Sequence, residues 1–245
     1  MSNFSIVNQQ NIKNSTFVLD EKESHHVISV LRLKINDQLT LTNGQGTIYQ
    51  AIINETHKKA VKGKILSKEH IKSDQKFKIH LALPLIKNNR FKIALEKSVE
   101  LGVDELTPVR FDKSVKSSVN HDKLLSSIHS ACKQSSRAFF PRLNKLKNFT
   151  EWHDNQSVNI VCLINSDKTF VEQLDTIKDL SKNNKINLII GPEGDFSENE
   201  KKIINEKNFI KVNLGRTILR TETAIVSLIS IICLLYTSPS PRDIS

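Results

Sequence analysis

Short, continuous apolar runs separated by helical stretches most restrict how the last two thirds of this chain can fold. The runs lie at residues 78–86, 158–164 and 186–190. Strands buried on both faces of a parallel sheet have such runs, whereas half-buried strands alternate apolar with polar residues. Helical periodicity is found at residues 90–101, 123–137, 170–180 and 224–236. Strands that alternate with helices predict an α/β domain from about residue 76 onward.

The first 70 residues have a pattern typical of antiparallel β structure. Residues 38–42 alternate with period two, and residues 47–53 and 60–66 are predicted to be further strands. The Asn43-Gly44 pair between the first two strands supplies the positive φ that a tight turn needs. Short strands joined by tight turns predict a small β-barrel.

A polar stretch at residues 69–76 is a candidate linker. We therefore expect one domain at residues 1–70 and a second at residues 76–236. The tail at residues 237–245, TSPSPRDIS, is expected to lie outside the fold.

Charge is distributed unevenly along the chain. The formal net charge is +10, and residues 76–150 supply most of it, whereas residues 151–245 are slightly acidic. A basic middle beside an acidic last third favours a polyanion-binding surface separate from a second working surface. A lysine-rich face that only contacts solvent is the alternative, and charge alone leaves the two open.

Cysteine spacing and the N-terminal residues indicate the compartment. Cys132, Cys162 and Cys233 have no CxxC spacing, which argues against a disulfide framework and a zinc site, so we expect no bound metal. The N-terminal residues lack a basic segment followed by an apolar one, so we expect a cytoplasmic protein. The apolar run at residues 224–236 is shorter than the roughly 20 residues that cross a bilayer, and it predicts a buried helix.

Residues 188–197, LIIGPEGDFS, form the first of two loops that carry candidate chemistry. A buried strand enters a GPEG turn, and Ser197 and Glu200 have the spacing of a capping box that opens a helix. Open α/β sheets bind ligands at the carboxyl ends of their strands, where glycines let the backbone approach closely. A tight turn with no ligand explains the same residues. The tetrapeptide alone favours that simpler interpretation.

Residues 212–224, VNLGRTILRTETA, form the second loop, ahead of a very apolar helix. Charged groups so near a core are costly unless they pair with one another or bind something. An internal ion pair between Arg220 and Glu222 would satisfy them, and it is compatible with a functional role. No P-loop, GxGxxG, HExxH or GxSxG motif accompanies these loops.

Together the two loops resemble those of the RsmE family of ribosomal RNA methyltransferases, within the SPOUT superfamily. The pairing of GPEG-x-FS with LG-x-x-ILR-TETA is specific, and the likeness covers nearly the whole chain. Three further stretches are similar to the family's RNA-binding segment, to its first strand and helix after the linker, and to its A-x-x-QS-x-R helix: residues 25–34, residues 83–103 and residues 131–137. Asp195 departs from the pattern, because many members have a third glycine there, and the tail at residues 237–245 matches nothing in the family.

The resemblance implies a PUA-like β-barrel at residues 1–70 and a SPOUT-type α/β domain at residues 76–236 with a C-terminal trefoil knot. It implies methylation of N3 of a uridine in the 16S ribosomal RNA of the small subunit, at position 1498 in the usual rRNA numbering, with S-adenosylmethionine as methyl donor. A homodimer through the knot is also implied, and the helix at residues 224–235 offers a suitable apolar surface.

The resemblance implies a bent S-adenosylmethionine among three loops, with the adenine held by backbone groups of Leu214, Ile218 and Leu219. The cofactor-binding residues expected from it are Ile164, Asn165, Gly191, Pro192, Glu193, Gly194, Leu214, Gly215, Ile218, Leu219 and Thr223. The basic residues expected to contact RNA phosphates are Arg32, Lys34, Lys87, Arg90, Arg137 and Arg142.

Arg220 and Glu222 are the catalytic candidates. Methyl transfer is an in-line displacement, so positioning supplies much of the rate, and uracil N3 must lose its proton before it attacks. An arginine near the uracil carbonyls stabilises the developing negative charge, which is the role expected for Arg220. Glu222 is then a base or an orienting partner. The target base lies within folded RNA, so we expect it to be extruded.

Two other functions remain open. A non-catalytic RNA-binding protein would keep the barrel and the basic surface, but nothing would then maintain both cofactor loops. A SPOUT methyltransferase acting on tRNA or on another rRNA site would share the loops, but it would not be expected to share the HH-x-x-x-VLRLK segment. The sequence does not decide between assembled subunits and free RNA as substrate.

Overall fold

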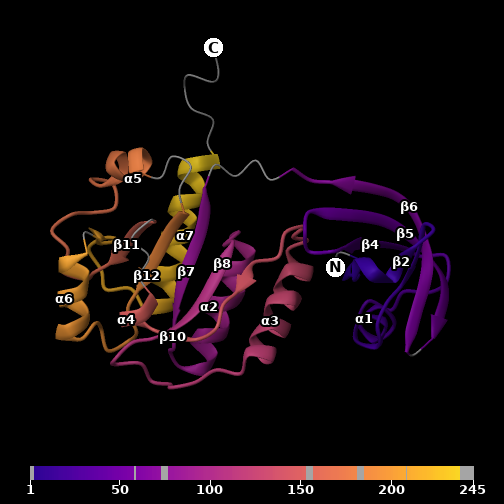
Figure 1. Cartoon of the computed structure of the whole chain (residues 1–245), viewed down its shortest axis with the longest axis horizontal. Helices are drawn as coiled ribbons and strands as arrows, with labels where there is room; N and C mark the ends of the chain where they lie inside the picture. Colours follow the sequence, from indigo (N-terminus) through magenta and orange to yellow (C-terminus); the bar gives the residue numbers. More distant parts are fainter. Residues whose placement is uncertain are drawn as a thin grey trace, which may run out of the picture. The chain divides into compact units, whose positions relative to one another are not determined.

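The structure, a computed structural model, describes residues 3–57, 59–72, 77–152, 157–180, 185–207 and 209–237. It divides into two compact units, the first comprising residues 1–74 and 129–140 and the second the remaining residues (Figure 1). The expected boundary near residues 70–76 assigns residues 129–140 to the second domain, whereas the structure groups them with the first unit. The expected tail lies outside the described residues, apart from Thr237.

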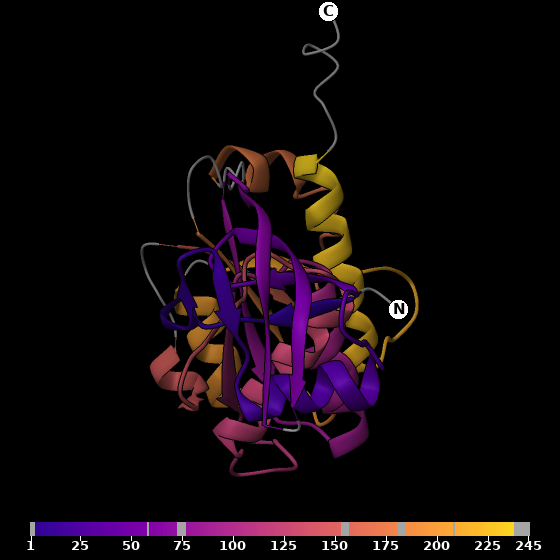
Figure 2. The ribbon, with the colours of Figure 1, turned by 90° about the vertical axis from the view of Figure 1, so that its right-hand side faces the viewer.

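A six-stranded sheet forms the first unit (Figure 2). Its strands are β1 (Phe4–Ile6), β2 (Ile12–Lys13), β3 (Thr16–Val18), β4 (Gln38–Thr42), β5 (Thr47–His57) and β6 (Ala60–His70). They follow the order β1-β4-β5-β6-β3-β2, and all neighbours pair antiparallel except β1 and β4. The predicted strands at residues 38–66 are confirmed. The hairpin of β5 and β6 is longer than its apolar pattern indicated.

Short helical turns cover this sheet. A 3₁₀ turn, η1, spans Gln9–Asn11, and α1 spans Glu21–His25 before it continues as a π-helical turn, η2, at His26–Val30. Asp20 begins α1, because its side chain accepts a hydrogen bond from the backbone N–H of Glu23 at 2.8 Å. Val27 then packs into the core that one face of the sheet forms.

The segment 129–140 packs against the turn between β4 and β5. A Cβ on Gly44 would lie 2.8 Å from the Phe140 ring, and one on Gly46 would lie 2.3 Å from the Phe139 ring. Both glycines have positive φ, so they serve the turn and the close approach of the two aromatic rings. Lys133 adds an ion pair to the buried Glu23 at 2.8 Å.

A seven-stranded parallel sheet forms the second unit. Its strands are β7 (Lys78–Pro84), β8 (Glu105–Arg110), β9 (Arg142–Leu143), β10 (Lys147–Asn148), β11 (Val158–Cys162), β12 (Lys185–Ile190) and β13 (Ile210–Val212). The order is β10-β8-β7-β12-β11-β13, with β9 also paired to β8. The predicted α/β class is therefore confirmed, and the apolar runs lie in the central strands β7, β12 and β11.

Helices cover both faces of this sheet. They are α2 (Asn88–Glu100), α3 (His121–Gln134), α4 (Phe149–Trp152), α5 (Leu174–Leu180), α6 (Glu198–Glu206) and α7 (Thr221–Thr237). One face packs Ala82 and Ile189 against α4 and α6. On the other face α2 and α7 pack together and contact β7 and β12, as Figure 1 shows for the yellow helix. Leu188 to Ile190 are all buried because both faces are covered.

The path of the chain after β12 is a crossover. The chain leaves β12 on one side of β11, forms α6, and returns as β13 on the other side of β11. It then passes through residues 213–220 into α7, which contacts β12 again. The family resemblance implies a trefoil knot in this C-terminal region, and the knot itself stays a prediction.

A row of hydrogen-bonded polar side chains crosses the buried sheet. His80 contacts Asn187 Oδ1 through Nδ1 at 2.9 Å and Thr107 Oγ1 through Nε2 at 2.7 Å. Asn187 donates in turn to Asn159 Oδ1 at 2.9 Å. Because Asn187 Oδ1 can only accept, the proton of a neutral His80 lies on Nδ1 and the Thr107 hydroxyl donates to Nε2. We call these four residues the buried polar row.

Candidate functional site

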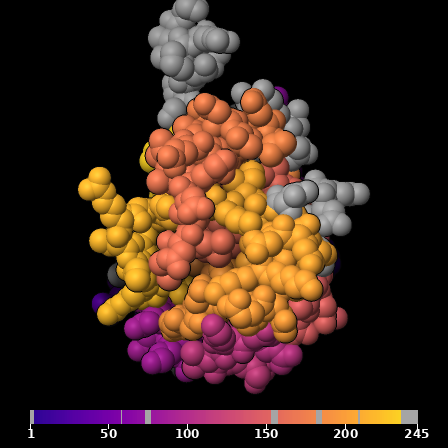
Figure 3. Space-filling model, turned by 90° about the vertical axis from the view of Figure 1, so that its left-hand side faces the viewer, coloured from indigo at the N-terminus to yellow at the C-terminus, as the bar shows by residue number. Residues whose placement is uncertain are grey.

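A cavity of about 340 Å³ lies at the carboxyl ends of three neighbouring strands of the second unit. Its walls are the loop after β11, the GPEG loop after β12 (residues 190–196) and the loop between β13 and α7 (residues 213–220, the second loop). Figure 3 shows the face of this unit on which the orange and yellow segments that include these loops lie side by side. This is the position at which open parallel sheets bind ligands.

Local sequence explains the shape of the GPEG loop. The N–H of Asp195 donates to Pro192 O at 3.0 Å, and Asp195 has a φ of 60°, so this aspartate adopts the left-handed conformation that the family's third glycine would allow. The predicted capping box is confirmed, because Ser197 and Glu200 bond each other's backbone N–H groups at the start of α6. A Cβ on Gly191 would lie 3.0 Å from the Phe196 ring, so the strand end needs a glycine.

Backbone hydrogen bonds join the second loop to the loop after β11. The N–H of Asn213 donates to Lys168 O at 2.9 Å, and the N–H of Phe170 donates to Asn213 O at 3.1 Å. The Asn213 side chain adds a bond to Ser166 O at 2.7 Å. Thr221, at the other end of the second loop, donates its hydroxyl to Gly191 O at 3.1 Å and so connects the loop to GPEG. The three walls are thus fixed to one another.

Most of the predicted cofactor residues line this cavity. Those that do are Ile164, Gly191, Pro192, Glu193, Leu214, Gly215, Ile218 and Leu219. Asn165, Gly194 and Thr223 do not line it: Gly194 packs against Lys113, and Thr223 is exposed on α7. The lining residues that sequence reasoning did not assign to the cofactor include Arg90, Cys162, Phe196, Asn213 and Thr221. Only their place beside the predicted loops could have indicated them.

The charged residues of the cavity do not pair as the sequence suggested. Arg220 is exposed and lines the cavity, and in the described part of the chain it forms no ion pair with Glu222. Instead Glu222 Oε1 lies 3.7 Å from Nε of Arg90, whose Nη1 lies 3.5 Å from Glu193 Oε1. Glu222, the second catalytic candidate, does not line the cavity, and its Oε2 is buried and has no hydrogen-bond partner among the described residues.

The predicted RNA contacts fall in both units. Arg32, Lys34 and Arg137 belong to the first unit, and Lys87, Arg90 and Arg142 belong to the second. Arg32 and Lys34 are exposed, as are Lys87 and Arg142. Arg142 pairs with Glu105, and Arg90 pairs inside the cavity, so only some of the six guanidinium and ammonium groups are free to bind phosphate.

The cysteines carry no reactive chemistry in this arrangement. All three are free thiols. Burial raises the pKa of Cys162, beside the cavity, to about 12 and that of Cys132 to about 11. Neither thiol is therefore ionised at neutral pH. Over the described residues, no cluster of three or more metal-ligating side chains occurs and no helix is long and apolar enough to cross a membrane.

Comparison with protein families assigns both units. Residues 73–233 match the RNA methyltransferase domain family, and residues 19–66 match the RNA methyltransferase PUA domain family. A ribosomal RNA small subunit methyltransferase E of Buchnera aphidicola is 32% identical over 87% of this chain and 85% of its own length. The protein of the same name from Rickettsia conorii is 29% identical over 94% of both chains.

Two solved structures are similar over nearly their full length. A methyltransferase of Legionella pneumophila in complex with bound SAM has a TM-score of 0.83 and 27% identity, and the match covers 95% of this chain and 97% of that one. The ribosomal RNA small subunit methyltransferase E of Neisseria gonorrhoeae, bound to S-adenosyl methionine, has a TM-score of 0.81 and 26% identity, with 95% and 98% covered. The matched families give this chain a PUA domain followed by an RNA methyltransferase domain.

Proposed function

The chain belongs to the ribosomal RNA small subunit methyltransferase E family, and on this premise we propose that it methylates N3 of a uridine in 16S rRNA with S-adenosylmethionine as methyl donor. The cavity at the carboxyl ends of β11, β12 and β13 is the proposed cofactor site. The two structures described above hold S-adenosylmethionine and share this fold, which supports the assignment.

Unpaired backbone donors in the second loop are the observation that carries the cofactor proposal. Within the described residues, the N–H groups of Leu214, Ile218 and Leu219 make no hydrogen bond. Leu214 and Leu219 are partly buried and Ile218 is exposed, so water can satisfy these N–H groups until a ligand replaces it. Donors in the wall of a cavity of about 340 Å³ suit a ligand that supplies acceptors, such as an adenine ring. The cofactor would contribute an electrophilic methyl group on a sulfonium sulfur.

This chain's own residues would bind and activate the uracil. Arg220, exposed at the cavity, is placed to stabilise negative charge that develops on the uracil carbonyls as N3 loses its proton. Glu222, in the first turn of α7, is the proposed acceptor of that proton. Because a stacked base cannot reach the cavity, the uridine would be extruded from the folded RNA.

The remaining parts of the proposal concern partners. The small-subunit RNA would contact exposed basic residues of both units, including Arg32, Lys34 and Lys87. A second copy of the chain would cover apolar side chains of the second loop and of α7, such as Ile218 and Leu234, which are largely exposed. Knot formation at the β12–β13–α7 crossover and a cytoplasmic location complete the proposal.

An assay of methyl transfer to defined RNAs tests the proposed function. The protein is incubated with labelled S-adenosylmethionine and, in parallel, small ribosomal subunits, free 16S rRNA or tRNA, and the modified base is mapped. We expect label at uridine N3 in the small-subunit RNA. Label in tRNA alone would favour the other SPOUT substrates, and calorimetry that detects no cofactor binding would favour a non-catalytic RNA-binding protein.

A further inference from the structure

Arg90 is the residue whose surroundings differ most from its sequence-based assignment. The sequence suggests a phosphate contact, but Arg90 lies in the first turn of α2, is only about a third exposed and lines the cavity. Its guanidinium lies 3.5 Å from Glu193 of the GPEG loop and 3.7 Å from Glu222 of α7. One arginine thus joins a carboxylate of the GPEG loop to a carboxylate in the first turn of α7.

The second oxygen of Glu222 is left without any partner. Oε1 faces Arg90, whereas Oε2 is buried and accepts no hydrogen bond. A buried carboxylate oxygen without a donor is costly. The guanidinium and the positive end of α7 offset part of that cost. Glu222 does not itself line the cavity, but its partner Arg90 and its neighbour Thr221 do, so Oε2 is an unpaired acceptor just behind the cavity wall.

We infer that Arg90 is a positioning residue that holds the Glu222 carboxylate so that Oε2 accepts the N3 proton of the target uracil. This inference rests on the proposed function. In the step, the N3–H bond breaks and the proton passes to Oε2. The electron pair on N3 forms the new N–C bond to the methyl group, while the C–S bond breaks and its pair stays on sulfur. The proton then passes from Glu222 to solvent, so no further reactant is needed.

The same arrangement distinguishes uracil from cytosine. Uracil carries a hydrogen on N3, whereas cytosine carries an unshared pair there. A carboxylate oxygen fixed at that position attracts the first and repels the second. Sites built to bond a particular donor discriminate strongly against an analogue that lacks it.

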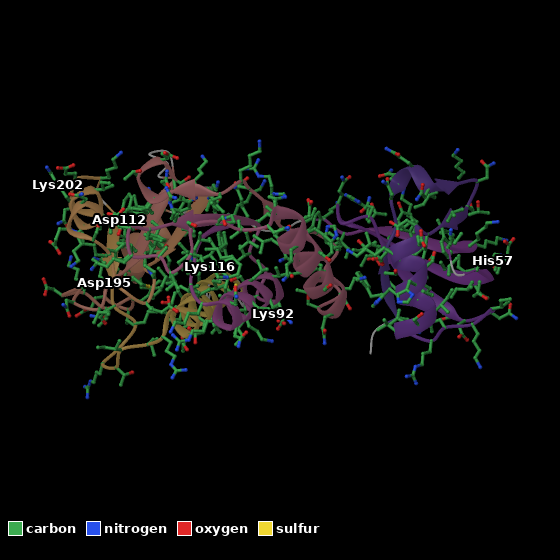
Figure 4. All side chains as sticks on the ribbon, turned by 90° about the horizontal axis from the view of Figure 1, so that it is seen from below. His57, Lys92, Asp112, Lys116, Asp195 and Lys202 are labelled. Atoms are coloured by element: carbon green, nitrogen blue, oxygen red, sulfur yellow. The ribbon has the colours of Figure 1, made fainter. Side chains whose placement is uncertain are left out.

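Two variants of Arg90 and one variant of a neighbouring lysine test the inference with full-length protein, labelled S-adenosylmethionine and the small-subunit RNA. Arg90→Gln is expected to lower kcat on the order of 10- to 100-fold with a KM for RNA and a Kd for S-adenosylmethionine within about threefold of wild type. Arg90→Lys is expected to have a higher kcat than Arg90→Gln but a lower one than wild type, because lysine keeps the positive charge but lacks the planar guanidinium that can bond two carboxylates. Lys92→Gln is the control, since Lys92 lies on the same helix, has a side chain that is 69% exposed and pairs with Glu96 (Figure 4).

The Glu222→Gln variant closes a double-mutant cycle. If Arg90 acts through Glu222, Arg90→Gln causes no further loss of kcat in the Glu222→Gln background. In the otherwise wild-type protein, Arg90→Gln also weakens the preference for uridine over cytidine at the target position. Independent, multiplied losses would overturn the inference. So would a raised KM for RNA with unchanged kcat and a smaller salt dependence, because a phosphate contact behaves in that way.

Two further outcomes are informative. If Arg90→Gln fails to fold, Arg90→Lys takes its place in the double-mutant cycle with Glu222→Gln. If the double variant then loses kcat by the product of the two single losses, the inference is overturned. If wild-type protein methylates neither 16S rRNA nor subunits, the proposed function fails before any variant is compared, so the two failures are distinguishable.

Discussion

The cavity and the buried polar row are two polar regions of the same parallel sheet, and they differ in whether their groups are paired. In the buried polar row, each end of the His80 ring has a hydrogen-bond partner, and Asn187 extends the chain to Asn159. Beside the cavity, by contrast, one buried oxygen of Glu222 has no partner within the described residues, and the N–H groups of Leu214, Ile218 and Leu219 have no protein partner there.

Pairing separates a structural role from a binding role where residue type does not. A network whose hydrogen bonds are all made stabilises one arrangement of the strands and has no free donor or acceptor for a ligand. A buried group without a partner needs an explanation, such as a catalytic role or a bound molecule that completes it. The comparison therefore predicts that substitutions in the cavity change catalysis and leave folding intact, whereas substitutions in the buried polar row do the opposite.

The largest effect is expected from Arg220→Ala. Loss of a donor that stabilises negative charge typically lowers kcat on the order of 10²- to 10³-fold. Since Arg220 is exposed and unpaired in the described part of the chain, Tm and the Kd for S-adenosylmethionine should stay close to wild type. Steady-state kinetics and thermal unfolding measure both. Lys202→Ala, an exposed charge on α6, is the control (Figure 4). Near-normal kcat in Arg220→Ala would remove this arginine from the mechanism.

Next in size is His80→Leu. The substitution removes the His80 partner of the Thr107 hydroxyl proton and of Asn187 Oδ1, although Asn144 and Asn159 still bond these two residues. Each unsatisfied buried group costs about 1–3 kcal/mol. We expect the free energy of unfolding to fall by about 3 kcal/mol, measured by urea denaturation. His57→Leu, at an exposed histidine of the first unit, should change it little (Figure 4). A His80→Leu protein as stable as wild type would show that the row is not structural.

Acid should weaken the fold through the same row. Burial lowers the pKa of His80 to about 4, below its ordinary value of 6.5. The unfolded chain therefore binds a proton at a higher pH than the folded one, so stability is complete above 6.5 and falls as the pH drops toward 4. Between pH 7 and pH 5 the loss is about 2 kcal/mol at 1.36 kcal/mol per unit. Urea unfolding at the two pH values measures it.

Glu105 extends this dependence to lower pH. Burial raises its pKa, but hydrogen bonds from Lys185, Asn144 and Arg142 outweigh burial and lower the pKa to about 2. Its contribution to stability is present above the ordinary value of 4.5 and is lost as the pH falls through about 2. A stability that did not change between pH 7 and pH 5 would contradict a neutral, fully bonded His80.

The smallest effect is expected at the edge of the cavity, from Ser197→Ala. Ser197 caps α6 and accepts a hydrogen bond from the Glu200 N–H at 3.2 Å. Loss of an N-cap side chain costs about 1 kcal/mol. Because α6 starts directly after the GPEG loop, a modest weakening of S-adenosylmethionine binding should accompany the loss. Ser197→Asn, which restores a capping oxygen without placing a second carboxylate beside Asp112, should recover most of the stability. Failure to do so would assign the effect to the bond from Ser197 to Asp112.

Local patterns predicted the elements that carry the site. The continuous apolar runs at residues 78–86, 158–164 and 186–190 became the central strands, and the spacing of Ser197 and Glu200 became a capping box. Such features depend on contacts between near neighbours in the chain, so periodicity and spacing are sufficient evidence for them. The short strands β9, β10 and β13 were missed because two or three residues carry too little periodicity.

Ion-pair and hydrogen-bond partners that lie far apart in the sequence could not be predicted from such local patterns. The expected Arg220–Glu222 pair joins near neighbours, but Glu222 pairs with Arg90, which α2 brings to the loops. His80 was not singled out either, because its partners lie on β8 and β12. The segment 129–140 belongs with the first unit because its two phenylalanines pack on the glycines of the β4–β5 turn.

The sequence by itself determined the α/β class, the two loops and the face of the sheet at which they meet, because hydrophobic periodicity and turn chemistry are local. Only the tertiary structure decided which charges neutralise one another and which polar atoms stay unpaired. Those outcomes depend on distances between side chains from different elements, and electrostatic and hydrogen-bond energies change steeply with such distances. In this chain, the packing of α2 against α7 pairs Glu222 with Arg90, and one oxygen of Glu222 has no hydrogen-bond partner among the described residues.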